Sequence, residues 1–266
     1  MSNRLAATPA RNLKRRDYVA ALARGLAVMQ AFANQNEYLT LSEVAKLTQM
    51  SRASVRRCLL TLESLGYMEA RGKFFRLAPR VLGLTRAYLS SSLLPRVAQP
   101  VIERVSETIG ESCSVSILHG DDVIYVARST ARRHEPSLLD VGAHLPAYCT
   151  SMGRVLLASL PDAELDAFLK RVELRALTPF TITDRKKLKR VILKVREEGM
   201  CLGDQEVERD LRAIAVPVLN RAGRVVAAMH AIASAGRAGK PDMTGVFLPV
   251  LRRAAAEMRP LLIGAA

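Results

Sequence analysis

Residues 39–77 read LTLSEVAKLTQMSRASVRRCLLTLESLGYMEARGKFFRL, and this stretch decides the fold of the first part of the chain. Thr40 and, three residues later, Glu43 form a capping box, in which a hydroxyl and a carboxylate each satisfy a free backbone N–H at a helix start. After a three-residue turn, Ser51 caps a second helix, and Gly66 ends that helix in a left-handed conformation. Two helices joined by so short a turn predict a helix-turn-helix.

The second of these helices has the character of a recognition helix. An apolar stripe that includes Val55 and Leu62 faces inward, which leaves the basic residues on the outward side. Such a helix enters the major groove of DNA with polar side chains near its N-terminal end, so Arg52 or Arg56 can reach guanine edges. The hydroxyls of Ser51, Ser54 and Thr61 would then hold phosphates.

A basic wing follows the helix. Residues 67–70 and 74–77 are strand-like, and Arg71-Gly72-Lys73 lies between them as a turn. Arg71 and Lys73 would contact phosphates or the adjacent minor groove. In the simpler alternative, the arginines form an ordinary solvated helix face and the wing is only a charged hairpin. The candidate DNA-binding residues are Thr40, Ser51, Arg52, Ser54, Arg56, Arg57, Arg71 and Lys73.

Helical segments flank this winged helix-turn-helix on both sides. Residues 17–33 predict a helix with Leu22, Leu26, Met29 and Phe32 on one face, and residues 1–16 read as a basic, disordered tail. We therefore expect a DNA-binding domain over residues 17–79. Residues 80–95 predict a linker helix that Pro95 interrupts, and the domain boundary is expected there.

The remaining residues, 96–266, predict an α+β domain. A helix over 97–109 precedes two strand-like segments at 112–118 and 123–128, and two more strand-like segments follow at 213–218 and 225–231. Both strand pairs have short turns, which is typical of hairpins in an antiparallel sheet. The other predicted helices cover residues 151–159, 162–171, 184–198 and 244–258.

Composition and charge point to a nucleic-acid partner. The 266 residues are 49% hydrophobic and 24% charged, as in a globular protein, but the formal net charge is +15. Residues 1–90 hold 15 Lys or Arg against 5 Asp or Glu, whereas the rest holds 25 against 20. The longest run without a charged residue is the thirteen-residue segment Val141 to Gly153, short of the ~18 residues of a membrane span. The start of the chain does not read as a secretory signal, so we expect a cytoplasmic protein, nucleoid-associated when DNA-bound.

Ordered matches over residues 17–258 give a resemblance to a known family. They include ALARGLAVMQAF, the helix-turn-helix stretch, FRLAPRVLGLTRAYL, VIYVARS, GAHLPAYCTSMGRVLLASL and LRAIAVPVLNRAGRVVAAM. The sequence resembles IclR-family transcriptional regulators, and LPAYCTSMGRVLLA is most similar to the subgroup that controls protocatechuate and p-hydroxybenzoate breakdown in the β-ketoadipate pathway. The resemblance implies a linker helix that supports dimerisation, a C-terminal effector-binding domain of GAF-like architecture, and dimers that pair into tetramers. RNA polymerase is a further candidate partner of such a regulator.

An enzyme remains the alternative from a different class. The histidines His119, His134, His144 and His230 are single, and the sequence has no GxSxG, HExxH or GxxxxGK[ST] motif. We expect no cofactor and no metal site, because the four cysteines also lack ligand spacing. A GAF-like thiol redox enzyme would use Cys149 or Cys113, and Cys149 precedes a predicted helix N-terminus that would lower its pKa. A nucleoid-type or RNA-binding protein would explain the charge but leave the second domain unused.

A small carboxylate effector, such as an aromatic acid or a β-ketoadipate-pathway metabolite, is expected in the second domain at residues 145–153. A helix N-terminus near Thr150 or Ser151 supplies the N–H donors and positive potential that a carboxylate needs. The resemblance also implies roles for Gly203 and the acidic segment after it, and His230 or Arg212 would donate to a carboxylate or phenol. In the simpler alternative, His230 is a satisfied core residue and Ser151 only caps the helix. The candidate effector-binding residues are Tyr148, Thr150, Ser151, Met152, Asp204, Arg212, Ala213, His230 and Ile232.

Overall fold

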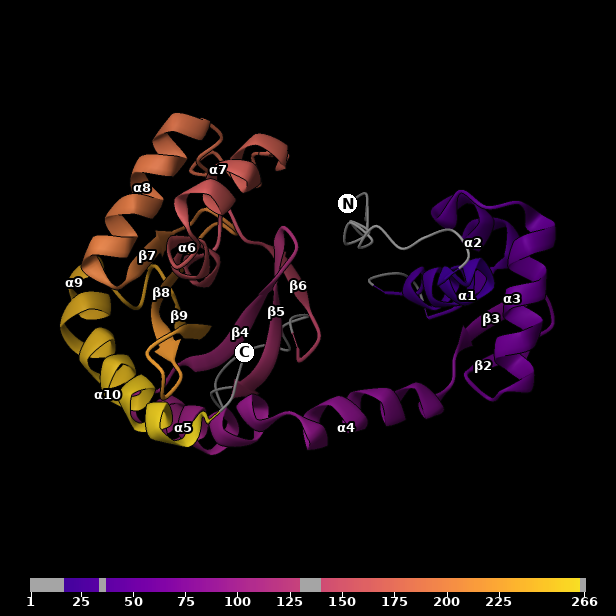
Figure 1. Ribbon diagram of the computed structural model, residues 1–266, viewed down its shortest axis with the longest axis horizontal. Coiled ribbons are helices and arrows are strands. Elements are labelled where there is room, and N and C mark those ends of the chain that lie inside the picture. The colour runs from indigo at the N-terminus through magenta and orange to yellow at the C-terminus, as the bar shows by residue number, and fades with distance from the viewer. Residues whose placement is uncertain (1–16, 34–36, 130–139, 264–266) are drawn as a thin grey trace. The chain divides into compact units, whose positions relative to one another are not determined.

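The computed structural model describes residues 17–33, 37–129 and 140–263 (Figure 1). The chain divides into two compact units between Ser91 and Ser92, and each unit is described by itself. The expected N-terminal tail and His134 lie outside the described residues. None of the helices in the described ranges is long and apolar enough to cross a membrane.

The N-terminal unit is a winged helix-turn-helix, as predicted. Helix α1 covers Ala20–Gln30, α2 covers Leu41–Thr48 and α3 covers Arg52–Ser64. The wing consists of β2 (Met68–Arg71) and β3 (Phe74–Leu77), and a two-residue strand β1 (Leu39–Thr40) pairs antiparallel with β3. The first helix is shorter than the predicted range of residues 17–33.

The helix boundaries have the local causes that the sequence indicates. The side chain of Thr40 accepts a hydrogen bond from the Glu43 backbone N–H, and the Glu43 carboxylate accepts one from the Thr40 N–H at 2.7 Å. The Ser51 hydroxyl accepts from the Ser54 N–H at 3.2 Å. Gly66 has a φ of +75°, a left-handed conformation that ends α3 at low steric cost. These caps hold α2 and α3 around a core that includes Val28, Val44, Val55, Leu59 and Met68.

The predicted interruption at Pro95 is wrong. After a 3₁₀ turn at Pro79–Val81, helix α4 covers Leu82–Ser91, and the helical conformation breaks at Ser92. Helix α5 then runs over Leu93–Ile109, so Pro95 lies in its first turn. Proline is tolerated there because the N–H groups of the first turn have no intrahelical acceptor.

The C-terminal unit is built on one antiparallel sheet of six strands in the order β6-β5-β4-β9-β8-β7. The predicted hairpins are present as β4 (Ser112–His119) with β5 (Asp122–Ser129) and β8 (Leu211–Leu219) with β9 (Val225–Ser234). The structure adds two short outer strands, β6 (His144–Pro146) and β7 (Cys201–Asp204). The predicted α+β class with an antiparallel sheet is confirmed.

Helices cover both faces of this sheet (Figure 1). Helices α6 (Ser151–Ala158), α7 (Asp162–Arg171) and α8 (Arg185–Glu198) contribute to the core on one face, while α5 and α10 (Leu248–Met258) contribute to the core on the other. A short helix α9 (Lys240–Asp242) and a π-helical turn at Met243–Phe247 continue without a break into α10, so the helical segment starts before the predicted Thr244. Along β9, Met229 and Ala231 face the α5 side and Ala228 faces the α6 side, the alternation of a strand. His230 has the same parity as Ala228 and so faces α6.

Candidate functional site

The exposed face of α3 carries the predicted arginines. Val55 and Leu59 are buried, whereas Arg52, Arg56 and Arg57 are exposed. Residues of a helix advance by about 100°, so Arg57 lies opposite the buried stripe and Arg52 and Arg56 lie together at one edge of the exposed face. None of these three guanidinium groups forms an ion pair with any residue of the described ranges. They are free to contact a polyanion.

The hydroxyls of Thr40 and Ser51 primarily cap helices. Thr40 Oγ1 accepts from the Glu43 N–H and donates to the Glu43 carboxylate at 2.7 Å, so its hydrogen is already used. Ser51 Oγ accepts from the Ser54 N–H, which leaves its own hydrogen available to a phosphate. Thr61 donates to the Arg57 carbonyl oxygen at 2.8 Å, which occupies the hydrogen expected for a phosphate.

The wing presents two cations at its tip. Arg71 and Lys73 are exposed on either side of Gly72, whose φ of +61° makes the tight turn. Lys73 Nζ lies 5.4 Å from the centre of the Phe74 ring. Arg76, further along β3, is instead held by the carboxylates of Glu37 and Glu69, so its role is to brace the sheet.

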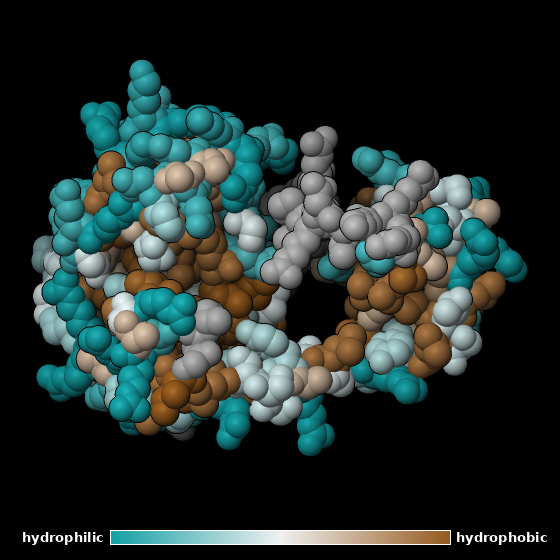
Figure 2. All heavy atoms as spheres, in the orientation of Figure 1, coloured by the Kyte–Doolittle hydropathy of each residue, from teal (hydrophilic) through white to brown (hydrophobic). Residues whose placement is uncertain are grey.

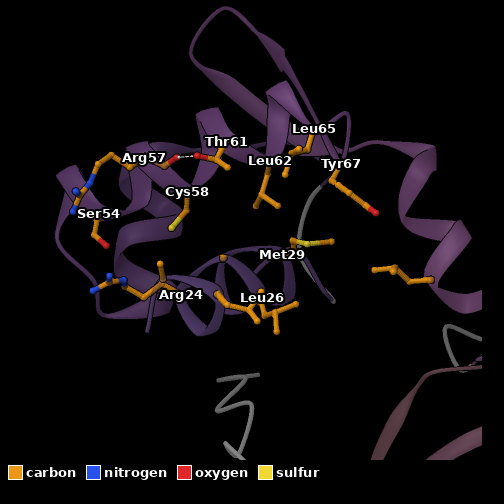
Figure 3. A pocket seen from close by; sticks show the side chains of 14 residues that line it. Arg24, Leu26, Met29, Ser54, Arg57, Cys58, Thr61, Leu62, Leu65 and Tyr67 are labelled. Atoms are coloured by element: carbon orange, nitrogen blue, oxygen red, sulfur yellow. Dashed lines mark hydrogen bonds between the residues drawn. The ribbon is translucent and has the colours of Figure 1, made fainter. Parts of the chain in front are cut away.

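An apolar groove lies between α1 and α3 in the same unit. It has a volume of about 570 Å³ and is lined mainly by apolar side chains. Met29, Leu26 and Leu62 point into it, and Arg24, Ser54 and Arg57 gather at one end (Figure 3). Leu22 and Leu26 are 62% and 49% exposed, so the predicted inward face of the first helix is largely open, with Phe32 alone of its four residues buried. Brown, hydrophobic residues are visible on this unit at the right of Figure 2.

A second cavity, of about 60 Å³, lies in the C-terminal unit beside the N-terminus of α6. Most predicted effector residues line it, together with residues from β5, β7 and the segment that links β7 to β8. Tyr148 and Asp204 do not line it. The lining residues are Tyr125, Leu145, Cys149, Thr150, Ser151, Met152, Gly203, Gln205, Glu206, Val207, Glu208, Leu211, Arg212, Ala213, His230 and Ile232.

The start of α6 is tightly built. Thr150 Oγ1 accepts from the Gly153 N–H and donates to the Pro146 carbonyl oxygen, both at 3.1 Å. A Cβ at Gly153 would lie 2.2 Å from the Ala147 carbonyl oxygen, so only glycine fits. Ser151 is 3% exposed and its hydroxyl has no hydrogen-bond partner among the described residues. Thr150, not Ser151, is the capping residue, which leaves the Ser151 hydroxyl for a ligand.

Tyr125 and His230 form a second polar group in the cavity. Their ring centres lie 5.7 Å apart with an interplanar angle of 63°. Burial, with the nearby charge of Arg128, lowers the pKa of His230 to about 4, so the imidazole is neutral at pH 7. No residue in the described ranges hydrogen-bonds the His230 ring nitrogens or the Tyr125 hydroxyl. His230 therefore lacks, among these residues, the partner that the simpler alternative assigns to it. Tyr125 lines the same cavity, although sequence reasoning did not name it.

The two predicted residues outside the cavity have structural partners. The Tyr148 hydroxyl donates to the Arg175 carbonyl oxygen at 2.6 Å. Asp204 accepts from Arg212 Nε at 2.7 Å and from Lys240 Nζ at 2.9 Å. Arg212 also donates to two backbone carbonyl oxygens, so most of its donors are occupied. It borders the cavity, but its partner on β9 is Ala233, a core residue on the α5 side, so its side chain faces away from the cavity and the expected donation to an effector is not supported.

A buried ion pair closes one wall of the cavity, and no pattern in the sequence indicates it. Arg154 of α6 is 1% exposed and Glu206 is 8% exposed. The Glu206 carboxylate also accepts from the Ile182 N–H at 3.2 Å. Two threonines hold the same segment, because Thr178 and Thr181 donate to the carbonyl oxygens of Gln205 and Glu206. These contacts fix the segment that faces α6 across the cavity.

The thiols do not have the properties of catalytic nucleophiles. Burial raises the pKa of Cys149 to about 12, which contradicts the lowering expected at a helix N-terminus. Burial also raises the pKa of Cys113.

His119 and His144, isolated in the sequence, have ring centres 6.4 Å apart. The described part of the chain nevertheless contains no group of three or more ligating side chains that could hold a metal ion.

Two family models match the chain. The IclR helix-turn-helix domain matches residues 21–72, and the model described as bacterial transcriptional regulator IclR C-terminal matches residues 86–259. Together the two matches cover both units of the structure.

Known proteins are similar over nearly the whole chain. The Pca regulon regulatory protein of Pseudomonas putida is 43% identical over 93% of this chain and 86% of its own. The p-hydroxybenzoate hydroxylase transcriptional activator of Acinetobacter baylyi is 36% identical over 94% of each chain. An IclR homolog of Microbacterium hydrocarbonoxydans, solved in complex with 4-hydroxybenzoate, is 25% identical with a TM-score of 0.78 and covers 91% of this chain and 99% of its own. The Pseudomonas and Acinetobacter relatives are named as a regulatory protein and a transcriptional activator, so the thiol-enzyme alternative finds no support.

Proposed function

The chain belongs to the IclR family of bacterial transcriptional regulators, and on this premise we propose that a hydroxylated aromatic acid, bound in the C-terminal cavity, controls its binding to an operator. One observation carries the proposal. Three buried polar side chains line a cavity at a helix N-terminus, namely Ser151, Tyr125 and His230, and no described residue hydrogen-bonds the side-chain polar atoms of any of them.

The carboxylate of the effector belongs at the start of α6. The backbone N–H groups of Ser151 and Met152 have no acceptor within the helix, and the helix dipole places partial positive charge there. The Ser151 hydroxyl adds a donor. Arg154 neutralises Glu206 on the opposite wall, which removes a charge that would repel an acid. The Microbacterium relative, complexed with 4-hydroxybenzoate, supports this class of ligand.

On the operator, Arg52 and Arg56 are proposed to read guanine edges in the major groove. Arg57 and the Ser51 hydroxyl would contact phosphates beside them, and Arg71 and Lys73 of the wing would contact phosphates or the adjacent minor groove.

A second copy of the chain is the proposed occupant of the groove between α1 and α3. A two-fold axis would bring together the exposed apolar faces of two copies, because one patch must serve both subunits. Leu84, which is 51% exposed, extends the groove onto α4. The oligomer would bind a palindromic operator at the nucleoid in the cytoplasm and contact RNA polymerase there. Pairing of such dimers into tetramers belongs to the same proposal.

Calorimetry and gel shift together test this function. We expect the full chain to bind 4-hydroxybenzoate or protocatechuate, and to bind the DNA upstream of its own gene more tightly than random duplex. Binding of β-ketoadipate alone would replace the aromatic class of effector by an aliphatic dicarboxylate. Addition of the bound acid should change the operator affinity, because two coupled sites influence each other reciprocally. Binding of none of these acids would refute the effector assignment, and equal affinity for random DNA would refute the operator assignment.

A further inference from the structure

We propose that His230 and Tyr125 read a ring hydroxyl of the effector, so that the cavity takes hydroxybenzoates and discriminates against unsubstituted benzoate. This inference rests on the proposed function and specifies which end of the site sets its selectivity.

The cavity has two polar ends separated by an apolar row. Ser151 lies against Gly203 of β7, where an added Cβ would be 3.6 Å from the Ser151 Cβ. Gly203 pairs with Ala213 of β8, and Ala213 pairs with Ile232 of β9. Ser151 therefore lies over this row of small and aliphatic side chains.

His230 is one step further along the same face. It is two residues from Ile232 on β9, a separation of roughly 6.6–6.8 Å along a strand. Along the cavity, the features therefore follow in this order: a helix N-terminus with a hydroxyl, an apolar row, and then the Tyr125–His230 pair. A benzoic acid with a hydroxyl on the far side of the ring has the same order of carboxylate, apolar ring and hydroxyl.

The hydrogen-bonding capacity of the far end matches a phenol. A neutral imidazole offers one N–H donor and one nitrogen acceptor, and a tyrosine hydroxyl can donate or accept. A phenolic hydroxyl can therefore donate to His230 and accept from Tyr125, which gives partners to both buried groups. A carboxylate offers only acceptors, so it would leave the imidazole acceptor unsatisfied and gain more at the α6 N-terminus.

The energetic consequence is discrimination against the unsubstituted ring. A site built to hydrogen-bond a hydroxyl rejects the analogue without it, because the buried polar groups stay unpaired. Benzoate would bury the same apolar area beside Tyr125 and His230 but leave both without a partner.

The test is a comparison of two acids on three proteins by titration calorimetry of the full chain. Wild type should bind 4-hydroxybenzoate at least about tenfold more tightly than benzoate. The three proteins are wild type, Tyr125→Phe and His230→Gln. Tyr125→Phe removes only the hydroxyl. His230→Gln removes the imidazole but keeps a polar side chain in the buried site, so that the variant folds. Each variant should lose affinity for 4-hydroxybenzoate while its benzoate affinity stays within about twofold, so the ratio falls toward one.

Four results would overturn the inference. Equal binding of both acids by wild type, or an unchanged ratio in both Tyr125→Phe and His230→Gln, would show that the hydroxyl is read elsewhere while the proposed effector class stands. A parallel loss of both acids in the variants would assign these residues to shape alone. Binding of neither acid by wild type would overturn this inference, and a titration with protocatechuate would then decide whether the effector assignment itself stands.

Discussion

Arg154 and Glu206 form a bidentate ion pair, with both N···O distances at 2.5 Å, between side chains that are 2% and 9% exposed. The pair joins the first turn of α6 to the segment between β7 and β8, the two walls of the C-terminal cavity. Arg154 Nε also donates to the Tyr148 carbonyl oxygen at 2.9 Å. The pair therefore sets the width of the cavity as well as neutralising two buried charges.

Removal of one partner should be costly. Arg154→Met leaves the Glu206 carboxylate buried without its counter-ion, and we expect a loss of about 3–5 kcal/mol in the free energy of unfolding of the C-terminal unit. The measurement is denaturant-induced unfolding of the full chain. Asp166→Asn breaks the partly exposed pair with Lys189 and is the matched control, with an expected loss under about 1 kcal/mol. Similar losses in the two variants would contradict a dominant role for the buried pair.

The segment opposite α6 should respond to the effector. The cavity of about 60 Å³ is far smaller than the roughly 300 Å³ of a small ligand site, so the cavity must widen when a ligand binds, and we expect this segment to shift. Gln205 and Asp210, at the ends of the segment, have φ of 60° and 64°, which marks them as its turning points. We expect hydrogen exchange of residues 205–211 to change when 4-hydroxybenzoate saturates the protein, and exchange in α10 to stay constant. Unchanged exchange in 205–211 would place the ligand elsewhere.

The fold was predictable where local signals determine it. Thr40, Ser51 and Gly66 each act within four residues of their own position, so the helix-turn-helix follows from the sequence. Strands β6 and β7 have only 3 and 4 residues and exist because a longer neighbour pairs with them, so no periodicity reveals them.

The site was less predictable for two physical reasons. Arg154 and Glu206 are 52 positions apart, and no pattern in the sequence indicates such a contact. Burial also reverses local expectations: the helix N-terminus suggested a lowered pKa for Cys149, but loss of solvent raises it. Leu22 and Leu26 do lie on an apolar helix face, but periodicity cannot distinguish a face covered by the same chain from one left open.

The DNA interface should separate base-reading from phosphate-binding residues. Arg56→Ala should cost about 1–3 kcal/mol on the specific operator and relax preference at one base pair. Lys73→Ala should weaken all sequences alike and reduce the salt slope by about one. Arg253→Ala, an exposed change on α10, is the control and should leave both quantities unchanged. Equal, sequence-independent losses for Arg56→Ala and Lys73→Ala would mean that α3 does not read bases through Arg56.

The apolar groove should govern self-association. Leu26→Glu places a charge on the exposed face of α1 and should weaken the dimer by at least tenfold, because a carboxylate would be buried at the interface. Sedimentation over a concentration series measures this. Val246→Glu alters a residue of the C-terminal unit that is 55% exposed and should leave the dissociation constant unchanged. A Leu26→Glu protein that dimerises as wild type does would remove the groove from the interface.

His230 should make stability depend on pH in acid. Its pKa is about 4 in the folded protein against an ordinary value of 6.5, so folded and unfolded chains are both neutral at this position above pH 6.5. Between pH 6.5 and pH 4 the unfolded chain binds a proton that the folded chain does not. The free energy of unfolding therefore decreases as the pH is lowered through this range. The slope is about 1.4 kcal/mol per pH unit and the total roughly 3 kcal/mol. His230→Gln has no titratable group at this position. We therefore expect the difference in unfolding free energy between wild type and variant to change from pH 7 to pH 4. This difference separates the contribution of His230 from that of the carboxylates, which both proteins share. Parallel curves for the two proteins would mean that His230 titrates normally. The neutral imidazole that accepts a hydrogen bond from the phenolic hydroxyl would then be only part of the population at pH 7.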